Sequence, residues 1–250
     1  MSKNNNFNKG ILLTAAGSFW WGFIGVICFK YIAFAGHIEV VIHRCLWTTV
    51  MLVLTSIIFS KFDKIKNVIK DKNNIFILFF SGILIFTNWA VWIYAVSTNR
   101  LIDASFGYFI MPIISVFLGF FFFKERLSFK GKISIFIVSI SIIFLIFSDF
   151  KSIPWVGLIV AFSWSFYNLL RKKINVETDI GLLIESLFIL PIILIAFYFV
   201  VQNNVNDFDI SNPFLMFILI LAGPMTVIPL YLYVRGVELC GLGPTGMIFY

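Results

Sequence analysis

The sequence predicts an all-helical protein that crosses a membrane several times and consists of two inverted five-helix repeats, the second of them incomplete. Three observations lead to this prediction. Of the 250 residues, 60% are apolar and only 12% are charged, a composition that soluble domains of this length do not have. Apolar segments long enough to cross a bilayer recur along the chain. Residues of the first half also recur in the second half at a nearly constant offset.

Eight mostly apolar segments reach the length of about 20 residues that an α-helix needs to cross the hydrocarbon core. The alternating pattern of a membrane β-barrel is missing, so helices must satisfy the backbone hydrogen bonds. The first segment is too long for a removable secretory signal and lacks its small-residue cleavage site. The predicted spans are residues 11–34, 39–60, 74–97, 104–123, 132–148, 153–170, 180–201 and 213–236.

Basic residues fall on alternate connections between these spans. The positive-inside rule therefore places the N-terminus and the basic connections in the cytoplasm. The net charge of +7 reflects this topology and does not indicate nucleic-acid binding. The predicted cytoplasmic side carries Lys3, Lys9, Lys61, Lys64, Lys66, Lys70, Lys72, Lys124, Arg126, Lys130, Lys132, Arg171, Lys172, Lys173 and Arg235, and the opposite side carries only Lys30, Arg100 and Lys151.

A repeat relates the two halves of the chain at offsets of 141 to 143 positions. Because an odd number of spans, five, precedes the second copy, the two copies are inverted in the membrane. We expect a first five-helix repeat at residues 1–149, a linker at 149–153 and a second, incomplete repeat within 150–250. The matching segments are Trp21–Phe23 with Trp164–Phe166, Ile38–Arg44 with Ile180–Ser186, and Ser81–Gly82 with Ala222–Gly223.

The second copy is shorter than the first. By the same offset residues 241–250 correspond to residues 100–109, so the sequence stops partway into a ninth span. A helix of about eleven residues rises only about 16 Å. Ending there would leave unpaired carbonyls and a terminal carboxylate at membrane depth. We therefore expect the parent protein to continue through a tenth span and to end in the cytoplasm.

Several segments resemble the EamA-type branch of the drug/metabolite transporter superfamily. The resemblance extends over the whole chain, and it implies a ten-span permease of a bacterial cytoplasmic membrane with a link to chloramphenicol sensitivity. The segments are E-V-V-I-H-R-C-L-W at Glu39–Trp47, N-W-A-V-W-I-Y-A-V at Asn88–Val96, G-Y-F-I-M-P at Gly107–Pro112, K-E-R-L at Lys124–Leu127, L-L-R-K-K-I at Leu169–Ile174 and L-L-I-E-S at Leu182–Ser186.

Ionisable residues inside the predicted spans are the first candidates for function, because a charge at membrane depth is costly and usually marks an ion or substrate pathway. Glu185 lies in the seventh span without an opposite charge nearby in its own helix. Glu39 and His43 share a face of the second span, and Arg44 lies one position further on. We expect Glu185 or His43, which occupy equivalent places in the repeat, to take up a proton. The alternative is that these groups only hold helices together, with Arg44 paired to Glu39.

Amides beside aromatic residues predict a cavity for a ligand. Such pairs lie four positions apart on the third span and on the sixth span. Their rings can stack on an aromatic solute or hold an organic cation. The alternative for any single tryptophan is packing or a place at the membrane interface. The predicted substrate-binding residues are Trp21, Asn88, Trp92, Tyr108, Trp164 and Asn168.

A stripe of mostly small residues runs along the fourth span at Gly107, Met111, Ser115 and Gly119. Such stripes let helices approach closely. We expect internal packing, and the seam of a homodimer is the alternative use.

These features predict a secondary transporter that moves a small organic solute, a metabolite or a drug, across the bilayer by alternating access between the repeats. Export is favoured by analogy with the family alone. An intramembrane enzyme acting on lipid or peptide is the alternative function, but motifs such as H-E-x-x-H and G-x-S-x-G are missing. A passive scaffold would leave the buried polar residues unexplained. Cys28, Cys45 and Cys240 lack metal-ligand spacing, so we expect neither a metal nor a cofactor.

Overall fold

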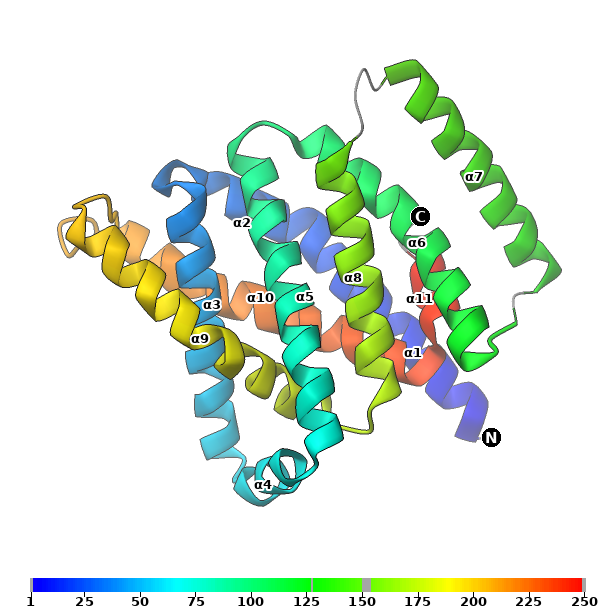
Figure 1. The fold of residues 1–250 in the computed structure, drawn as a ribbon, viewed down its shortest axis with the longest axis horizontal. Coiled ribbons are helices and arrows are strands. Elements are labelled where there is room, and N and C mark those ends of the chain that lie inside the picture. Colours follow the sequence, from blue (N-terminus) through cyan, green and yellow to red (C-terminus); the bar gives the residue numbers. More distant parts are fainter. Residues whose placement is uncertain (1, 127, 150–153, 249–250) are drawn as a thin grey trace.

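The computed structural model describes residues 2–126, 128–149 and 154–248, which form helices joined by short connections (Figure 1). The predicted linker at 149–153, apart from the backbone of Asp149, and Leu127 of the K-E-R-L segment lie outside the described residues. The elements are α1 Ser2–Phe19, the π-helix η1 Trp20–Gly25, α2 Val26–Tyr31, the 3-10 turn η2 Ala33–Ala35, α3 His37–Ile58, α4 Phe62–Lys70, α5 Lys72–Ser97, α6 Leu101–Phe123, α7 Phe129–Asp149, α8 Trp155–Lys173, α9 Thr178–Gln202, α10 Pro213–Cys240 and α11 Leu242–Met247.

Among the described residues, six helical segments are long and apolar enough to cross a membrane. They correspond to six of the eight predicted spans. Helices α7 and α8 occupy the other two predicted segments, with 21 and 19 residues. Helix α8 is the more polar because it carries Ser163, Ser165 and Asn168 and ends in a basic run. The six segments are Asn5–Tyr31, His37–Ile58, Lys72–Ser97, Leu101–Phe123, Thr178–Gln202 and Pro213–Cys240.

Polar side chains start two of the long helices. Asp71 precedes α5 and accepts a hydrogen bond of 2.9 Å from the backbone N–H of Asn73. Asn212 precedes α10 and accepts a hydrogen bond of 3.1 Å from the N–H of Leu215, with Pro213 at the first helical position. Both arrangements satisfy N–H groups that the first turn of a helix leaves unpaired. The connections at Asp71 and Asn212 therefore fix where these spans begin.

The segment between α3 and α5 is helical, although its basic residues predicted only a connection between two spans. Helix α4 places Ile65 and Val68 against a small apolar cluster that includes Ile77, Leu78 and Ile174. Its lysines and its aspartate stay exposed. An amphipathic helix at the end of the bundle explains the mixture of charged and apolar residues in this segment.

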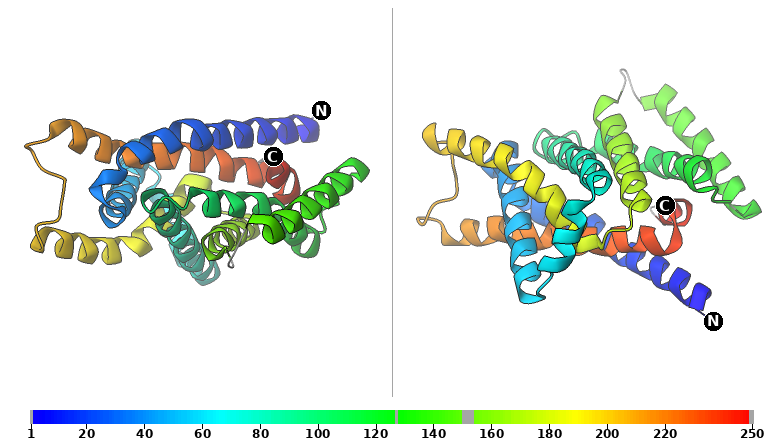
Figure 2. Two further views of the ribbon diagram at one scale, coloured as in Figure 1. Left: turned by 90° about the horizontal axis from the view of Figure 1, so that it is seen from above. Right: turned by 60° about the horizontal axis from the view of Figure 1, so that its bottom comes forward.

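Helices from the two halves of the chain pack against each other in pairs. Helix α1 runs along α10, and α5 packs on α8 (Figure 2). Helix α3 lies against α10 and α9, while α9 also contacts α5. Helix α7 stands at the edge of the bundle and, among the described elements, touches chiefly α6 (Figure 1). The core of the protein is therefore formed between the halves.

Two glycines at equivalent places in the repeat let helices approach closely. A side-chain carbon at Gly82 of α5 would lie 3.1 Å from the backbone oxygen of Glu185 on α9. One at Gly223 of α10 would lie 2.6 Å from the backbone of Trp47 on α3. Both glycines thus allow one helix to pack directly against the backbone of another.

The stripe of small residues on α6 packs inside the protein. Gly107 and Gly157 of α8 approach so closely that a side-chain carbon at either would collide with the backbone of the other. Further along, the hydroxyl groups of Ser115 and Ser165 lie 3.5 Å apart. The predicted internal packing is correct for these positions, and they are not free to form the seam of a homodimer.

Three of the basic connections meet at one end of the bundle. Lys61 before α4 and Lys64 within α4 pair with Glu177 before α9. Lys172 at the end of α8 pairs with Glu125 after α6. The sequence placed all these basic residues on one side of the membrane, and the ion pairs join the connections that carry them.

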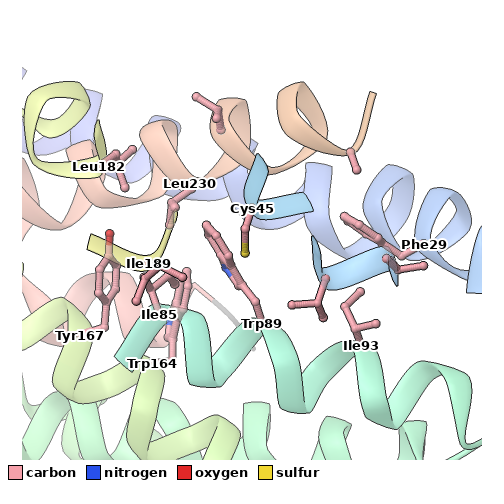
Figure 3. Packing of buried hydrophobic residues seen from close by; sticks show 14 of the residues in the cluster. Phe29, Cys45, Ile85, Trp89, Ile93, Trp164, Tyr167, Leu182, Ile189 and Leu230 are labelled. Carbon is pink, nitrogen blue, oxygen red and sulfur yellow. The ribbon is translucent and has the colours of Figure 1, made fainter. Parts of the chain in front are cut away.

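Large apolar side chains fill the core and also cover the outside. Trp89 of α5 reaches toward Cys45 of α3 in the centre, with Ile85 and Ile189 close by (Figure 3). Many phenylalanines are exposed, among them Phe117, which is 60% accessible. An apolar surface of this extent is what a protein surrounded by lipid presents. The fold is therefore that of a multi-pass membrane protein.

Candidate functional site

The first span changes its helical geometry beside a cavity. Residues Trp20–Gly25 form a π-helix between α1 and α2. Such wide turns are frequently found at functional sites. Three of its residues, Trp21, Gly22 and Gly25, line a cavity of about 430 Å³. A side chain added at Gly22 would meet nothing within 4 Å, so this glycine leaves the cavity open.

The cavity brings together most of the predicted substrate-binding residues. Its volume falls in the range of small-molecule sites, and its walls come from both halves of the chain. Five of the six predicted residues line it, together with Trp89 and with Arg44, which the sequence analysis considered only for proton coupling or for holding helices together. Its described lining residues are Ser18, Trp21, Gly22, Gly25, Val26, Phe29, Arg44, Asn88, Trp89, Trp92, Leu101, Ala104, Ser105, Tyr108, Trp164 and Ile248.

Asn88 and Asn168 have different surroundings. The amide nitrogen of Asn88 donates hydrogen bonds of 3.1 Å to the backbone oxygen of Val160 and to the hydroxyl of Ser163. Asn88 therefore joins α5 to α8 at the cavity wall. Asn168 is buried, donates to the backbone oxygen of Trp164 at 2.9 Å and is absent from the described cavity lining. The structure does not bring Asn168 into the site.

Arg44 extends from α3 into an aromatic cage. Its guanidinium carbon lies 4.7 Å from the ring centroids of Phe29 and Trp89. The Trp92 ring centroid lies 5.9 Å away. Positive charge over aromatic faces is stabilised by the ring quadrupoles. The ring of Trp92, which the sequence analysis offered to an organic cation, thus already has a cation of the protein itself beside it.

Glu39 holds the connection between α9 and α10. Its carboxylate accepts hydrogen bonds from the backbone N–H of Asp207 at 2.8 and 2.9 Å and of Phe208 at 3.0 Å. Burial, followed by the charge of Glu39, raises the pKa of Asp207. The pairing of Glu39 with Arg44, which the sequence left open, is not formed. Glu39 instead binds the α9–α10 connection, at a residue 168 positions away in the sequence.

His43 completes the same stripe of α3. The indole N–H of Trp47 donates to its Nδ1 at 3.2 Å, and its Nε2 lies 3.5 Å from Glu39. The ring of Phe208 stacks on the imidazole, with centroids 4.6 Å apart. The stripe Glu39–His43–Trp47 therefore faces protein, as its spacing predicted.

Glu185 sits in a buried polar network between α5, α8 and α9. It accepts hydrogen bonds from the hydroxyl groups of Ser81 at 2.6 Å and of Tyr167 at 3.3 Å. Its Oε1 lies 3.6 Å from a guanidinium nitrogen of Arg171. His43 contacts Phe197 on α9, which is about 18 Å along that helix from Glu185. The two predicted proton carriers thus lie at separate places.

Arg171 is a site residue that the sequence analysis missed. It was counted only among the basic residues of the cytoplasmic side after the sixth span, but it is buried and also donates to the backbone oxygen of Thr178 at 3.2 Å. Gly181 makes this possible, since a side chain there would collide with the guanidinium. The sequence held a signal, because Tyr167 and Arg171 are four residues apart and so share one face of α8.

Glu125 is a second residue whose partners the sequence pattern did not predict. It lies in the K-E-R-L segment, and its carboxylate accepts hydrogen bonds from the backbone N–H of Leu242 at 3.2 Å and of Gly243 at 2.9 Å. Gly241 turns the chain here with a positive φ of 97°. Glu125 therefore caps the first turn of α11. Groups of three or more His, Cys, Asp or Glu residues suited to a metal ion do not occur among the described residues.

The helical fold, the apolar exterior and a cavity lined by the first half together with Trp164 and Ile248 of the second are those of a multi-pass membrane protein of the transporter class. Residues 8–147 match the EamA-like transporter family, and the chain belongs to that family. It is 31% identical over 242 residues to Protein RarD of Escherichia coli (strain K12), covering 97% of this chain and 81% of that protein. The chain is thus a RarD-like member of the family.

Two further relatives are named only as transporters. The chain is 33% identical over 248 residues to "Uncharacterized transporter YojE" of Bacillus subtilis (strain 168), covering 97% of this chain and 81% of that protein. It is 31% identical over 244 residues to an "Uncharacterized transporter" of Vibrio cholerae, covering 97% of this chain and 80% of that protein. No solved structure matches the chain.

Proposed function

We propose that the protein is a secondary-active permease that exports small organic solutes across the cytoplasmic membrane by alternating access. The observation that carries this proposal is the cavity of about 430 Å³ lined from both halves of the chain. A site between two repeats can be opened to either side of the membrane when one repeat rocks against the other. Membership of a transporter family supports the same reading.

The helix packing supports two inverted repeats. In the predicted correspondence the first span matches α8, α3 matches α9 and α5 matches α10. If the repeats are equivalent, the contact of α1 with α10 should have a counterpart between α8 and α5. The contact of α3 with α10 should likewise have a counterpart between α9 and α5. All four contacts occur. The equivalent glycines Gly82 and Gly223 also make equivalent close approaches.

The distribution of charge supports a cytoplasmic N-terminus. The ion pairs of Lys61, Lys64 and Lys172 gather basic connections at one end of the bundle. Basic residues accumulate on the cytoplasmic side of bacterial membrane proteins. The opposite end carries the clamp between Glu39 and the α9–α10 connection.

The chemistry of the cavity favours transport over an intramembrane enzyme. None of its described lining residues is Asp, Glu, His, Cys or Lys. Acid–base or nucleophilic catalysis usually requires such groups within reach of the substrate. Arg44, the charged residue of the lining, binds charge but does not exchange protons at physiological pH.

Proton coupling through Glu185 or His43 is part of the proposal. Either group must change its partners to take up a proton. Glu185 would weaken its pairing with Arg171, and His43 would lose the hydrogen bond from Trp47. Uptake by Glu185 would therefore loosen a contact between α8 and α9, and uptake by His43 would change a contact within α3. Changes of this kind can bias a conformational equilibrium.

Proteoliposomes provide the test of transport and of coupling. The full-length protein is reconstituted, and uptake of a metabolite panel is measured with and without a pH gradient. We expect protein-dependent flux, and a weaker effect of the gradient in Glu185→Gln or His43→Ala. His37→Ala is the matched control, because the other histidine packs on Tyr94 away from Glu39. Unchanged gradient-driven flux in both variants would remove proton coupling, and absence of any flux would argue against a permease.

A further inference from the structure

The charged group of the cavity is a cation without an acidic partner. Arg44 is 4% exposed, and the described residues give its guanidinium neither a hydrogen bond nor an ion pair. Other buried charges of the bundle are paired, as Arg171 is with Glu185. An unpaired charge in a poorly solvated place is costly. A ligand that carries the opposite charge removes this cost when it enters the cavity.

Further hydrogen-bond donors around the cavity lack acceptors. Buried atoms with no partner among the described residues include the hydroxyl of Ser18 and the indole N–H groups of Trp21 and Trp89. An indole nitrogen can only donate a hydrogen bond, and a guanidinium can only donate as well. Residues that line the cavity thus carry unpaired donors. Such a set fits a ligand rich in acceptors and disfavours one rich in donors.

We propose that the cavity binds a small organic monoanion, with its carboxylate on Arg44 and its apolar or aromatic body against the tryptophans. The proposal rests on the permease function and names its substrate class. The planar guanidinium matches a carboxylate with two parallel hydrogen bonds. One cation in the lining offsets one negative charge, so a carboxylate fits better than a phosphate dianion. An organic cation is rejected because Arg44 repels it and already covers the ring faces.

Binding to the purified full-length protein in detergent tests the class of ligand directly. Four probes share a phenyl ring and differ in charge: phenylacetate, phenylacetamide, 2-phenylethylammonium and phenyl phosphate. Their affinities are measured at neutral pH by calorimetry and by quenching of tryptophan fluorescence. We expect phenylacetate to bind at least about tenfold more tightly than the neutral amide, because charge-assisted hydrogen bonds are the stronger ones. The phosphate should bind more weakly than the carboxylate, and the cation should not bind.

Three variants attribute this preference to Arg44. Arg44→Gln should abolish the difference between phenylacetate and phenylacetamide, while Arg44→Lys should keep it at lower affinity. Ser105→Asp places a negative charge in the lining at an exposed position and should weaken phenylacetate without disturbing a buried contact. The Ser105→Asp result decides the question if Arg44→Gln fails to fold. Arg100→Gln is the matched control, since this arginine pairs with Asp103 outside the cavity lining.

The outcomes separate this proposal from the permease function. Equal or tighter binding of the amide or the cation overturns the anionic class, as does an unchanged preference in Arg44→Gln or Ser105→Asp. If phenyl phosphate binds more tightly than phenylacetate, the carboxylate class is overturned and the ligand is a phosphate ester. If neither phenylacetate nor indole-3-acetate nor hexanoate binds, the class is wrong even when proteoliposomes transport another solute. If phenylacetate binds through Arg44 but nothing crosses the liposomes, the site stands and the permease function fails.

Discussion

Trp21 and Trp164 meet edge to face, with ring centroids 5.0 Å apart and planes at 73°. They are 143 positions apart and occupy equivalent places in the sequence repeat. Two equivalent residues can touch each other only near the axis that relates their repeats. Both also line the cavity. The contact therefore supports a pseudo-two-fold axis passing close to the site, where a rocking motion would open it to either side.

The Trp21–Trp164 contact gives the first prediction. In a double-mutant cycle with Trp21→Leu and Trp164→Leu, we expect a coupling of about 0.5–1.5 kcal/mol, because edge-to-face aromatic pairs contribute this beyond their buried area. Unfolding in SDS measures the free energies. Trp155→Leu serves as the control partner, since Trp155 contacts Tyr94 and Arg100 instead. Simple addition of the two losses for Trp21 and Trp164 would contradict the contact.

Gly22 offers a way to close the cavity without disturbing the fold. We expect Gly22→Leu to prevent ligand binding and transport, because the new side chain projects into open space within the lining. Its free energy of unfolding should change by no more than about 0.5 kcal/mol in either direction, apart from a gain in helix propensity. The measurement compares phenylacetate affinity and SDS unfolding. Phe23→Leu, at an exposed neighbour absent from the cavity lining, should leave both unchanged. Normal binding by Gly22→Leu would show that the ligand lies elsewhere.

The buried pair of Arg171 and Glu185 gives a prediction about stability. Arg171→Gln leaves an unpaired carboxylate in the core and should destabilise the protein by about 3–5 kcal/mol. The double variant Arg171→Gln, Glu185→Gln should be more stable than Arg171→Gln alone, since it leaves no uncompensated charge. SDS unfolding measures both. The half-exposed pair of Arg235 and Glu238 is the control, and Arg235→Gln should cost at most about 1 kcal/mol. A loss of free energy of unfolding in Arg171→Gln as small as that in Arg235→Gln would show that Glu185 needs no partner.

Glu39 is expected to order the α9–α10 connection. Glu39→Gln replaces an ionised acceptor by a neutral one and should cost about 1.5–3 kcal/mol, the contribution of hydrogen bonds to charged groups. Hydrogen exchange should show the amides of Asp207 and Phe208 losing protection. Asp209→Asn changes an exposed acceptor in the same connection and should leave those two amides protected. Retained protection in Glu39→Gln would mean that Phe208 stacking alone holds the loop.

The ion pairs of Glu177 predict a dependence of stability on pH. The hydrogen bond from Lys64, aided by Lys61 and opposed by burial, lowers the pKa of Glu177. A carboxyl whose pKa is lowered in the folded state contributes stability above its unfolded pKa and loses it as the pH falls through the folded pKa. We therefore expect wild type to exceed Glu177→Gln in melting temperature at neutral pH, and the difference to vanish in acid. The difference should correspond to less than about 1 kcal/mol, because Glu177 is half-exposed.

The control for this pH dependence is Asp63→Asn. Asp63 begins α4 near the same end of the bundle and makes no ion pair among the described residues. Its melting temperature should follow wild type at every pH. A Glu177→Gln difference that persists in acid would assign the effect to packing rather than to charge.

The sequence by itself determined the elements that depend on local pattern. Span length and apolar composition gave six helices close to their observed bounds, because a segment in lipid must satisfy its own backbone. The spacing of Glu39, His43 and Trp47 correctly gave one face of α3. The stripe at Gly107 correctly indicated close internal packing, since side-chain volume along one helix face is a local property.

Only the tertiary structure decided which partners these residues have. The sequence placed Arg171 among the basic residues of the cytoplasmic side and offered the tryptophan faces to a cationic solute. In the structure Arg171 pairs with Glu185, and Arg44 lies in the aromatic cage. Neither result follows from spacing, because Phe29 and Trp89 reach Arg44 from two other helices. A charged side chain in a membrane protein takes whichever buried partner the helix packing brings to it, and that packing joins residues that are far apart in the chain.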